Sequence, residues 1–180
     1  AYSRVSRHQP NIELTRRIAE LAGPGYERVC LASSGSEAME LALKFLRQYM
    51  VAKGQLKKQR IITLAPSYHG STIATLAITG DDALGPFIDG FAVKSERIPA
   101  PLQYRVPDGH TQTSYRMECA EALEAAILKL GAENVLAFAV EPVGGLATGA
   151  QMLSEDYANR VREICTKHGV YLVYDEILCG

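Results

Sequence analysis

Residues 135–145 are Val135-Leu136-Ala137-Phe138-Ala139-Val140 followed directly by Glu141-Pro142-Val143-Gly144-Gly145. The six apolar residues have the length of a strand and no polar alternation, which is typical of a strand covered on both faces. The glutamate, proline and glycines after them indicate a turn. In an open α/β sheet, ligands lie beyond the carboxyl ends of the strands. We therefore expect the turn at Glu141 to contribute to a site.

Three other segments show the same succession of a short apolar strand and a polar or glycine-bearing turn. Because turns from separate parallel strands can converge on one crevice, these segments predict an anion cradle, an aromatic face and acidic groups in one place. That combination suits a phosphorylated aromatic cofactor. The strands and their turns are Arg28–Ala32 with Ser33-Ser34-Gly35-Ser36, Ile61–Ala65 with Pro66-Ser67-Tyr68-His69-Gly70, and Val170–Tyr174 with Asp175-Glu176.

Helical periodicity separates these strands, which predicts an α/β fold. Strand, helix and strand in succession imply parallel pairing, so we expect a three-layer α/β/α architecture with a mostly parallel sheet. A capping box of Ser34 with Glu37 predicts the start of one helix of about four turns. The other expected helices are 11–22, 70–78, 115–130 and 154–168.

Two segments are expected to lie outside the regular core. The residues from about Asp81 to Ser114 contain four prolines, which predicts extended surface loops with one short strand near Phe91 to Val93. The basic stretch that includes Lys57, Lys58 and Arg60 is expected to be solvated.

Composition excludes several classes of protein. The chain has 180 residues, 47% of them hydrophobic, and a formal charge of -1 with both signs interspersed, so no basic stripe indicates nucleic acid. No apolar run approaches the ~20 residues of a membrane span, and the first residues do not form a secretory signal, so we expect a cytoplasmic protein without a membrane partner. The four cysteines lack CxxC spacing, which favours reduced core thiols over a metal site or disulfides.

Each candidate site residue has a functional and a structural interpretation. Ser34, Gly35 and Ser36 at a helix start suit a phosphate, because free amides and the helix dipole favour an anion there, but serines there also simply cap helices. Asp175 could bind a protonated ring nitrogen, or be a surface or capping carboxylate, and Glu141 carries the same ambiguity.

The aromatic side chains of the second turn are equally open to two interpretations. Tyr68 could present its ring to a planar cofactor or pack at the core, and His69 could bond a ligand or its own turn. A hydrolytic triad could be assembled from Ser36 or Ser67 with His69 and Asp175. The absence of a GxSxG elbow disfavours it. Without GxxxxGK[ST] or GxGxxG, the usual nucleoside triphosphate and dinucleotide sites are disfavoured too.

Together the segments resemble the class III family of pyridoxal-phosphate-dependent aminotransferases, which have the type I fold of the aspartate aminotransferase superfamily. Four blocks occur in the family's order over nearly the whole chain. They are Ser34-Gly35-Ser36-Glu37-Ala38 with Ala42-Leu43-Lys44, Tyr68-His69-Gly70, Glu141-Pro142-Val143-Gly144-Gly145, and Lys167-His168-Gly169 with Asp175-Glu176-Ile177. Met39 and Ile177 differ from the commoner Asn and Val of the family.

The resemblance implies a role for each matching residue in binding pyridoxal 5'-phosphate (PLP). Gly35 and Ser36 would hold the phosphate, with Ser34 beside them, and His69 would lie at the cofactor site. Glu141 would organise the substrate side. Tyr68 would stack on the ring, Asp175 would pair with the ring nitrogen, and Ile177 would pack on the opposite ring face.

The resemblance also implies what the rest of the protein supplies. The family's catalytic lysine, which forms the Schiff base, lies a few dozen residues beyond the block at Asp175, whereas Lys167 precedes it on a helix end suited to solvent. We therefore expect residues 1–180 to be the central part of the PLP-binding large domain, with the lysine beyond Gly180 and the small domain elsewhere. The chain also begins without Met, which favours an internal piece of a longer protein.

The activity that the resemblance implies is transamination. An amine or omega-amino acid would give its amino group to a keto acid such as pyruvate or 2-oxoglutarate, in a homodimer with the active site at the subunit interface. Aminomutases, racemases and decarboxylases share the same blocks. A non-catalytic protein of the same fold is the alternative from another class.

Overall fold

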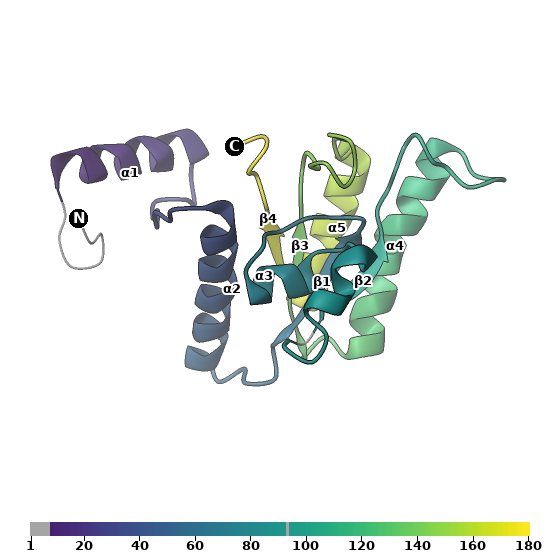
Figure 1. The fold of residues 1–180 in the computed structure, drawn as a ribbon, viewed down its shortest axis with the longest axis horizontal. Coiled ribbons are helices and arrows are strands. Elements are labelled where there is room, and N and C mark those ends of the chain that lie inside the picture. Colours follow the sequence, from purple (N-terminus) through teal and green to yellow (C-terminus); the bar gives the residue numbers. More distant parts are fainter. Residues whose placement is uncertain (1–7, 93) are drawn as a thin grey trace.

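A computed structural model describes residues 8–92 and 94–180 of the chain. Helices and strands alternate through most of this length, as Figure 1 shows. In chain order the elements are α1 Gln9–Ala22, α2 Gly35–Ala52, β1 Arg60–Ala65, α3 Ile73–Ile78, the 3₁₀ helix η1 Asp82–Phe87, β2 Glu96–Pro99, α4 Gln112–Leu130, β3 Val135–Val140, α5 Glu155–His168 and β4 Tyr171–Tyr174.

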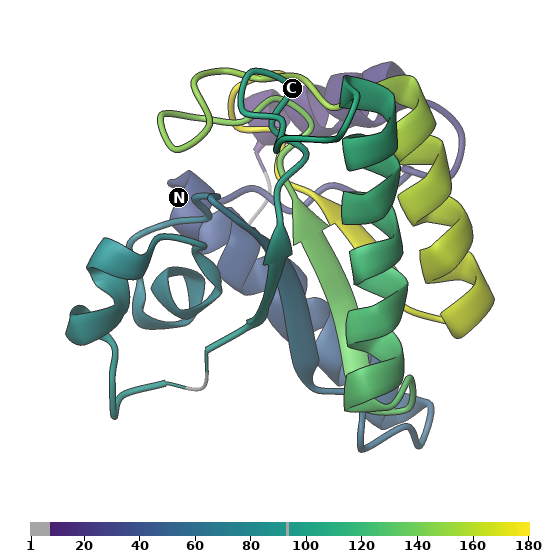
Figure 2. The same cartoon turned by 90° about the vertical axis from the view of Figure 1, so that its right-hand side faces the viewer.

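The four strands form one parallel sheet in the order β2-β1-β3-β4. Helices α4 and α5 cover one face, and α2 and α3 lie on the other (Figure 2). This confirms the predicted three-layer α/β/α architecture. The predicted boundaries of Val135–Val140 are those of β3, and β1, α5 and β4 lie within one residue of their predictions.

The core explains why β3 carries no polar alternation. All six of its side chains are buried, because a cluster that includes Leu123 and Ile164 packs on one face of the sheet. A smaller cluster of Met39 and Ile78 packs on the other face, against Ala139. A strand covered on both faces buries apolar groups at every position.

The order of the strands creates a switch point between β1 and β3. The chain leaves β1 for β2 on one side, through α3, and then returns through α4 to β3 on the other side of β1. The two crossovers lie on opposite faces, as right-handed connections in opposite directions require. Ligands of open α/β sheets bind at such a point, outside the carboxyl ends of the strands.

The predicted strand at Arg28–Ala32 is wrong. Residues 26–32 belong to no helix or strand, and they lie outside the four-stranded sheet. The apolar pattern indicates an extended segment, but a strand also needs a pairing partner, and the sheet of the described residues ends at β4. The first βαβ unit is therefore not formed as predicted, although α2 is. That helix has 18 residues, about five turns rather than four.

The proline-rich segment also differs from its prediction. Phe91 and Ala92 lie in a turn and a bend, Val93 lies outside the described residues, and the short strand is β2, a few residues later. Pairing with β1 selects this register, because it buries Ile98 in the main core. The predicted loops also contain η1.

Two helix starts differ from their predictions for local reasons. In the capping box at α2, Ser34 accepts from the Glu37 amide as predicted, but the Glu37 carboxylate accepts from Ser33 rather than from Ser34. The helix expected from Gly70 begins at Ile73, since Gly70 has φ +136°, outside the helical region.

Lys58 is buried, contrary to the prediction of a solvated basic stretch. Its ammonium donates to the carbonyl oxygens of Ala132, Val135 and Gly169 at 3.1, 3.0 and 2.8 Å. Burial lowers the pKa of Lys58, and the nearby Glu133 opposes that shift. Lys58 thus binds the start of β3 and the segments before β3 and β4, at the edge of the sheet opposite the predicted site.

The cysteines only partly follow their prediction as core thiols. All four are free, but only Cys119 and Cys165 are buried, and Cys30 and Cys179 are exposed. Burial raises the pKa of Cys165 to about 12. Within residues 8–92 and 94–180, no cluster of His, Cys, Asp and Glu is suited to a metal ion, and no helix has the length and apolar content to cross a membrane.

Candidate functional site

The turns after β1, β3 and β4 meet at the switch point. Their contacts join residues that are 73 and 106 positions apart in the sequence. Figure 2 shows the arrowhead of β3 pointing to the side of the molecule where the C-terminal end and the loop after β3 also lie. The predicted convergence of these three turns is therefore present in the structure.

Glu141 joins the turn after β1 to its own turn after β3. Its Oε2 atom accepts a hydrogen bond from the Tyr68 amide at 2.9 Å, and its Oε1 atom accepts from the Gly145 amide at 3.0 Å. The side chain is only 6% exposed. Both carboxylate oxygens are thus bound to backbone, which assigns Glu141 to holding the two turns in place.

Asp175 and His69 form a buried pair. The His69 Nδ1 and Asp175 Oδ2 atoms are 3.0 Å apart, and the His69 and Asp175 residues are 2% and 8% exposed. An ionised carboxylate only accepts, so Nδ1 carries the proton in this bond. The His69 amide donates to Thr79 Oγ1 at 3.0 Å, and the Ile177 amide donates to Asp175 Oδ1 at 3.4 Å. These contacts fix the orientation of the carboxylate.

The other ring nitrogen of His69, Nε2, is buried and has no hydrogen-bond partner among the described residues. A buried polar atom without a partner costs free energy. Among the described residues, the ring of His69 is held only through its Nδ1 bond to Asp175. Asp175 is too buried to be a surface carboxylate, and its role toward a ring nitrogen stays a prediction.

The start of α2 lies beside the same turns. Ser36 Oγ accepts a hydrogen bond from the Ser71 amide at 3.0 Å, and a Cβ atom on Gly35 would lie 3.3 Å from Ile177 Cδ1. Ser34 caps the Glu37 amide at 3.2 Å. The first turn of a helix leaves amides without intrahelical partners, and they favour an anion. The start of α2, where such amides lie, is therefore next to Ile177.

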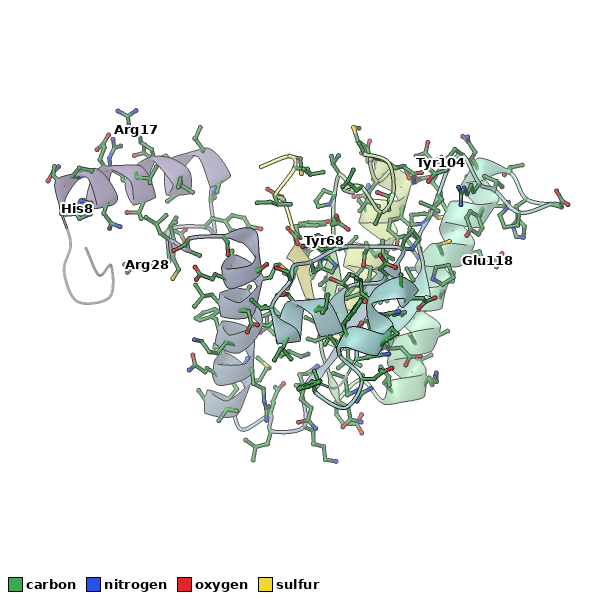
Figure 3. The ribbon with its side chains drawn as sticks, viewed as in Figure 1. His8, Arg17, Arg28, Tyr68, Tyr104 and Glu118 are labelled. Carbon is green, nitrogen blue, oxygen red and sulfur yellow. The ribbon has the colours of Figure 1, made fainter. Side chains whose placement is uncertain are left out.

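A cavity of about 710 Å³ opens at this edge of the sheet. Tyr68 and Ile177 both border it, and they are 46% and 65% exposed, so both can contact a bound molecule. Figure 3 shows Tyr68 between α2 and α4. Another cavity, of about 650 Å³ between α1 and residues 23–31, is bordered by none of the predicted site residues.

The hydrolytic triad is not assembled. Ser67 is 1% exposed, donates to the Leu64 carbonyl at 2.7 Å and accepts from the Gly80 amide. Ser36 contacts the Ser71 amide, and no serine hydroxyl contacts His69 Nε2 among the described residues. Both serines therefore serve the backbone.

The sequence did not predict several residues that hold the turns in position by hydrogen bonds or by close backbone approach. Thr79 accepts from the His69 amide and donates to the Thr75 carbonyl. A Cβ on Gly80 would lie 1.9 Å from the Leu64 carbonyl oxygen, and one on Gly144 would lie 1.8 Å from Thr148 Oγ1. Gly144 belongs to the turn predicted after Val140, but no signal in the sequence pointed to Gly80 or Thr79.

The sequence pattern of the family described as Aminotransferase class-III matches residues 2–180. The chain belongs to the class III aminotransferase family. The resemblance in the four sequence blocks is thereby confirmed.

Curated relatives of this class III chain are aminotransferases with different amine substrates. It is 37% identical over 179 residues to the diaminobutyrate--2-oxoglutarate transaminase of Halomonas elongata, which covers 96% of the chain and 37% of the relative. It is 35% identical to the putrescine--pyruvate aminotransferase of Pseudomonas aeruginosa, and the match covers 96% of this chain and 38% of the relative. It is 41% identical to the hypotaurine/taurine--pyruvate aminotransferase of Paracoccus denitrificans, and the match covers 87% of this chain and 34% of the relative. The chain thus spans little more than a third of these relatives.

Solved structures of transaminases have the same fold. An amine transaminase from an uncultivated Pseudomonas species, in its PLP-bound form, aligns with a TM-score of 0.88 at 30% identity, covering 100% of this chain and 40% of that one. An (S)-enantioselective omega-transaminase from Thermomicrobium roseum aligns with a TM-score of 0.86 at 32% identity, covering 96% and 38%. The agreement supports the type I α/β fold predicted from the sequence.

Proposed function

We propose that the full-length protein is a PLP-dependent aminotransferase, which moves an amino group from an amine or omega-amino acid to a keto acid of the pyruvate or 2-oxoglutarate type. The observation that carries this proposal is the buried Asp175–His69 pair at the switch point, beside a cavity bordered by Tyr68 and Ile177. Membership of the class III family supports it. Relatives named for 2-oxoglutarate and for pyruvate support the two acceptor types.

The donor set of the site fits PLP. A pyridinium nitrogen needs a buried, fixed carboxylate, and Asp175 is one. A phosphate needs amides and hydroxyls at a helix start, which Ser34, Gly35 and Ser36 supply. A planar ring needs contacts on both faces, for which we propose Tyr68 and Ile177.

PLP supplies an electron sink for bond cleavage at the carbon that bears the amino group. Asp175 would hold the proton on the ring nitrogen, because a neighbouring negative charge favours the protonated form. His69 would keep that carboxylate in position through its 3.0 Å bond. Glu141 would keep Tyr68 against the ring by holding its amide. Tyr68 would also limit the access of water to the ring.

We propose that the Schiff-base lysine lies in the protein outside residues 1–180. Two lysines of the described chain are committed elsewhere, which supports this. Lys58 donates to three backbone carbonyls, and the exposed Lys167 side chain pairs with Glu124 at 2.7 Å. Residues 1–180 would then be the central part of the large domain, and the small domain would come from the rest of the protein.

We further propose a cytoplasmic homodimer. The two exposed free cysteines, Cys30 and Cys179, suit a reducing compartment. The family resemblance implies the dimer, with the active site at the subunit interface, and the exposed apolar side chains Phe87 and Phe91 make residues 82–92 a candidate contact. Sedimentation velocity of the full-length protein tests the dimer.

The experiment that tests the function is an amine-to-keto-acid assay on the full-length protein with PLP. We expect carbonyl product only when pyruvate or 2-oxoglutarate is present in stoichiometric amount. Product formed without any amino acceptor would instead indicate an aminomutase, a racemase or a decarboxylase. No product from a panel of amines, in folded protein with PLP bound, would indicate a non-catalytic protein.

A further inference from the structure

The cavity at Tyr68 contains one carboxylate to which the proposed transamination gives no role. Asp81, directly before η1, borders the same cavity as Tyr68, Glu141 and Ile177. Most of the remaining wall is apolar, from Leu146, Ala147, Ala150 and Leu178. An unassigned charged group in an apolar wall beside the reaction centre is a candidate for substrate recognition.

The charge of the described cavity wall is negative. The residues that border it among the described part of the chain include no lysine, arginine or histidine. They include two carboxylates, but Glu141 uses both of its oxygens for the amides of Tyr68 and Gly145. Asp81 is therefore the carboxylate of this wall that remains able to bind a ligand cation.

Asp81 is oriented but not fully used by its own contacts. Its Oδ1 atom accepts from the Ala83 amide at 2.9 Å as the cap of η1, and it is half-buried. The neighbouring cation, Arg97, pairs with Asp82 at 2.6 Å and donates to the Thr79 carbonyl at 2.7 Å. The second oxygen of Asp81 has no protein partner among the described residues. Helix capping thus holds the carboxylate in place at the cavity.

We infer, on the basis of the proposed aminotransferase function, that Asp81 determines specificity by binding the distal ammonium group of a diamine substrate. The reacting amine lies on the Tyr68 side of the cavity, and the methylene chain contacts the apolar wall of Leu146 and Leu178. Attraction between opposite charges is stronger in an apolar cavity than in bulk water. A substrate with a distal carboxylate is repelled by the same group, so diamines are preferred to omega-amino acids.

The test compares three probes of equal chain length on the full-length holoenzyme. They are 1,4-diaminobutane, butylamine and 4-aminobutanoate, each with pyruvate. We expect Asp81→Asn to lower kcat/KM for 1,4-diaminobutane about tenfold or more, mainly through KM, because a hydrogen bond to a charged group is lost. We expect butylamine to change less than about twofold and 4-aminobutanoate to improve. Asparagine keeps an oxygen for the Ala83 amide, so the cap is preserved.

Asp82→Asn is the matched control, because this adjacent carboxylate is fully exposed, pairs with Arg97 and does not border the cavity. It should leave the ratio between the probes unchanged. Equal losses for 1,4-diaminobutane and butylamine in Asp81→Asn, or an unchanged ratio, would overturn the inference.

Binding without turnover separates this inference from the proposed function. In calorimetric titration of the full-length protein, 1,4-diaminobutane should bind about tenfold more tightly than butylamine, and Asp81→Asn should remove the difference. Failure of turnover with every amine, while that difference persists, would refute transamination alone. Equal binding of both probes to the wild-type protein would refute the role of Asp81.

Discussion

The two hydrogen bonds that the Glu141 carboxylate accepts allow the stability of the site to be predicted. In Glu141→Ala, the amides of Tyr68 and Gly145 lose acceptors at 2.9 and 3.0 Å. Hydrogen bonds to charged groups contribute about 1.5–3 kcal/mol each, so two of them sum to about 3–6 kcal/mol. Because both bonds are only part-buried, water replaces some of this, and we expect a loss of about 3 kcal/mol in the free energy of unfolding.

Urea unfolding of the full-length protein, followed by far-UV circular dichroism, measures that loss. PLP affinity should fall at least about tenfold, because the turn that carries Tyr68 is released. Glu141→Gln should give an intermediate loss, since its amide keeps one acceptor but turns a donor toward the second N–H. Glu118→Ala, which removes an exposed carboxylate of α4 far from Tyr68 in Figure 3, is the control. If Glu141→Ala stays within about 0.5 kcal/mol of this control, the reasoning is refuted.

Three further predictions address the ring-nitrogen partner, the buried lysine and an ion-paired carboxylate. Asp175→Asn should lower kcat about 100-fold with an unchanged circular dichroism spectrum, because a neutral amide cannot hold a pyridinium proton. Near-normal turnover of this variant would show that Asp175 is not the partner of the ring nitrogen. Lys58→Met should cost about 2–4 kcal/mol in urea unfolding, because three carbonyls lose a donor, and a smaller change than about 0.5 kcal/mol would contradict this. Hydrogen bonds from Lys167 and His168 lower the pKa of Glu124 from 4.5 to about 2. The stability that Glu124 contributes is therefore present above pH 4.5 and is lost as the pH falls toward 2. In Glu124→Gln, the urea midpoint of unfolding should depend less on pH between 4.5 and 2 than it does in the wild-type protein. An unchanged dependence on pH would contradict the assignment.

Local patterns predicted the elements whose identity depends on their own residues. Val135–Val140 is apolar at every position because both faces are covered, and its boundaries were predicted correctly. α5 was predicted nearly to its ends, because Gly169 adopts the left-handed conformation, with φ +61°, that stops a helix. The convergence of turns followed from parallel connectivity alone.

The errors occurred where distant parts of the chain decide the outcome. Arg28–Ala32 has the pattern of a strand, but strands are defined by their partners, and the described residues provide none. Lys58 appeared to be a solvated lysine because its three carbonyl partners come from residues 74 to 111 positions away. Their positions follow from the assembled sheet rather than from the local sequence.

In the candidate site, too, local residue types were predictable and contacts between distant residues were not. The residue types at the turns predicted Asp175, Tyr68 and Glu141 as site residues, because carboxylates and an aromatic ring follow strands there. The 3.0 Å bond between His69 and Asp175 could not be predicted, since it depends on the spacing of β1, β3 and β4 in the sheet. Asp81 begins the segment for which the prolines predict surface loops with one short strand, and no motif marks it as a site residue.

The most direct test of the account is reduction of the full-length protein with borohydride in the presence of PLP, followed by peptide mass mapping. We expect a single pyridoxyl-labelled lysine outside residues 1–180, because the family resemblance places the Schiff-base lysine beyond Gly180 and because Lys58 and Lys167 are engaged by backbone carbonyls and by Glu124. Absence of a specific label in folded protein, or a label on any lysine within residues 1–180, would contradict this expectation.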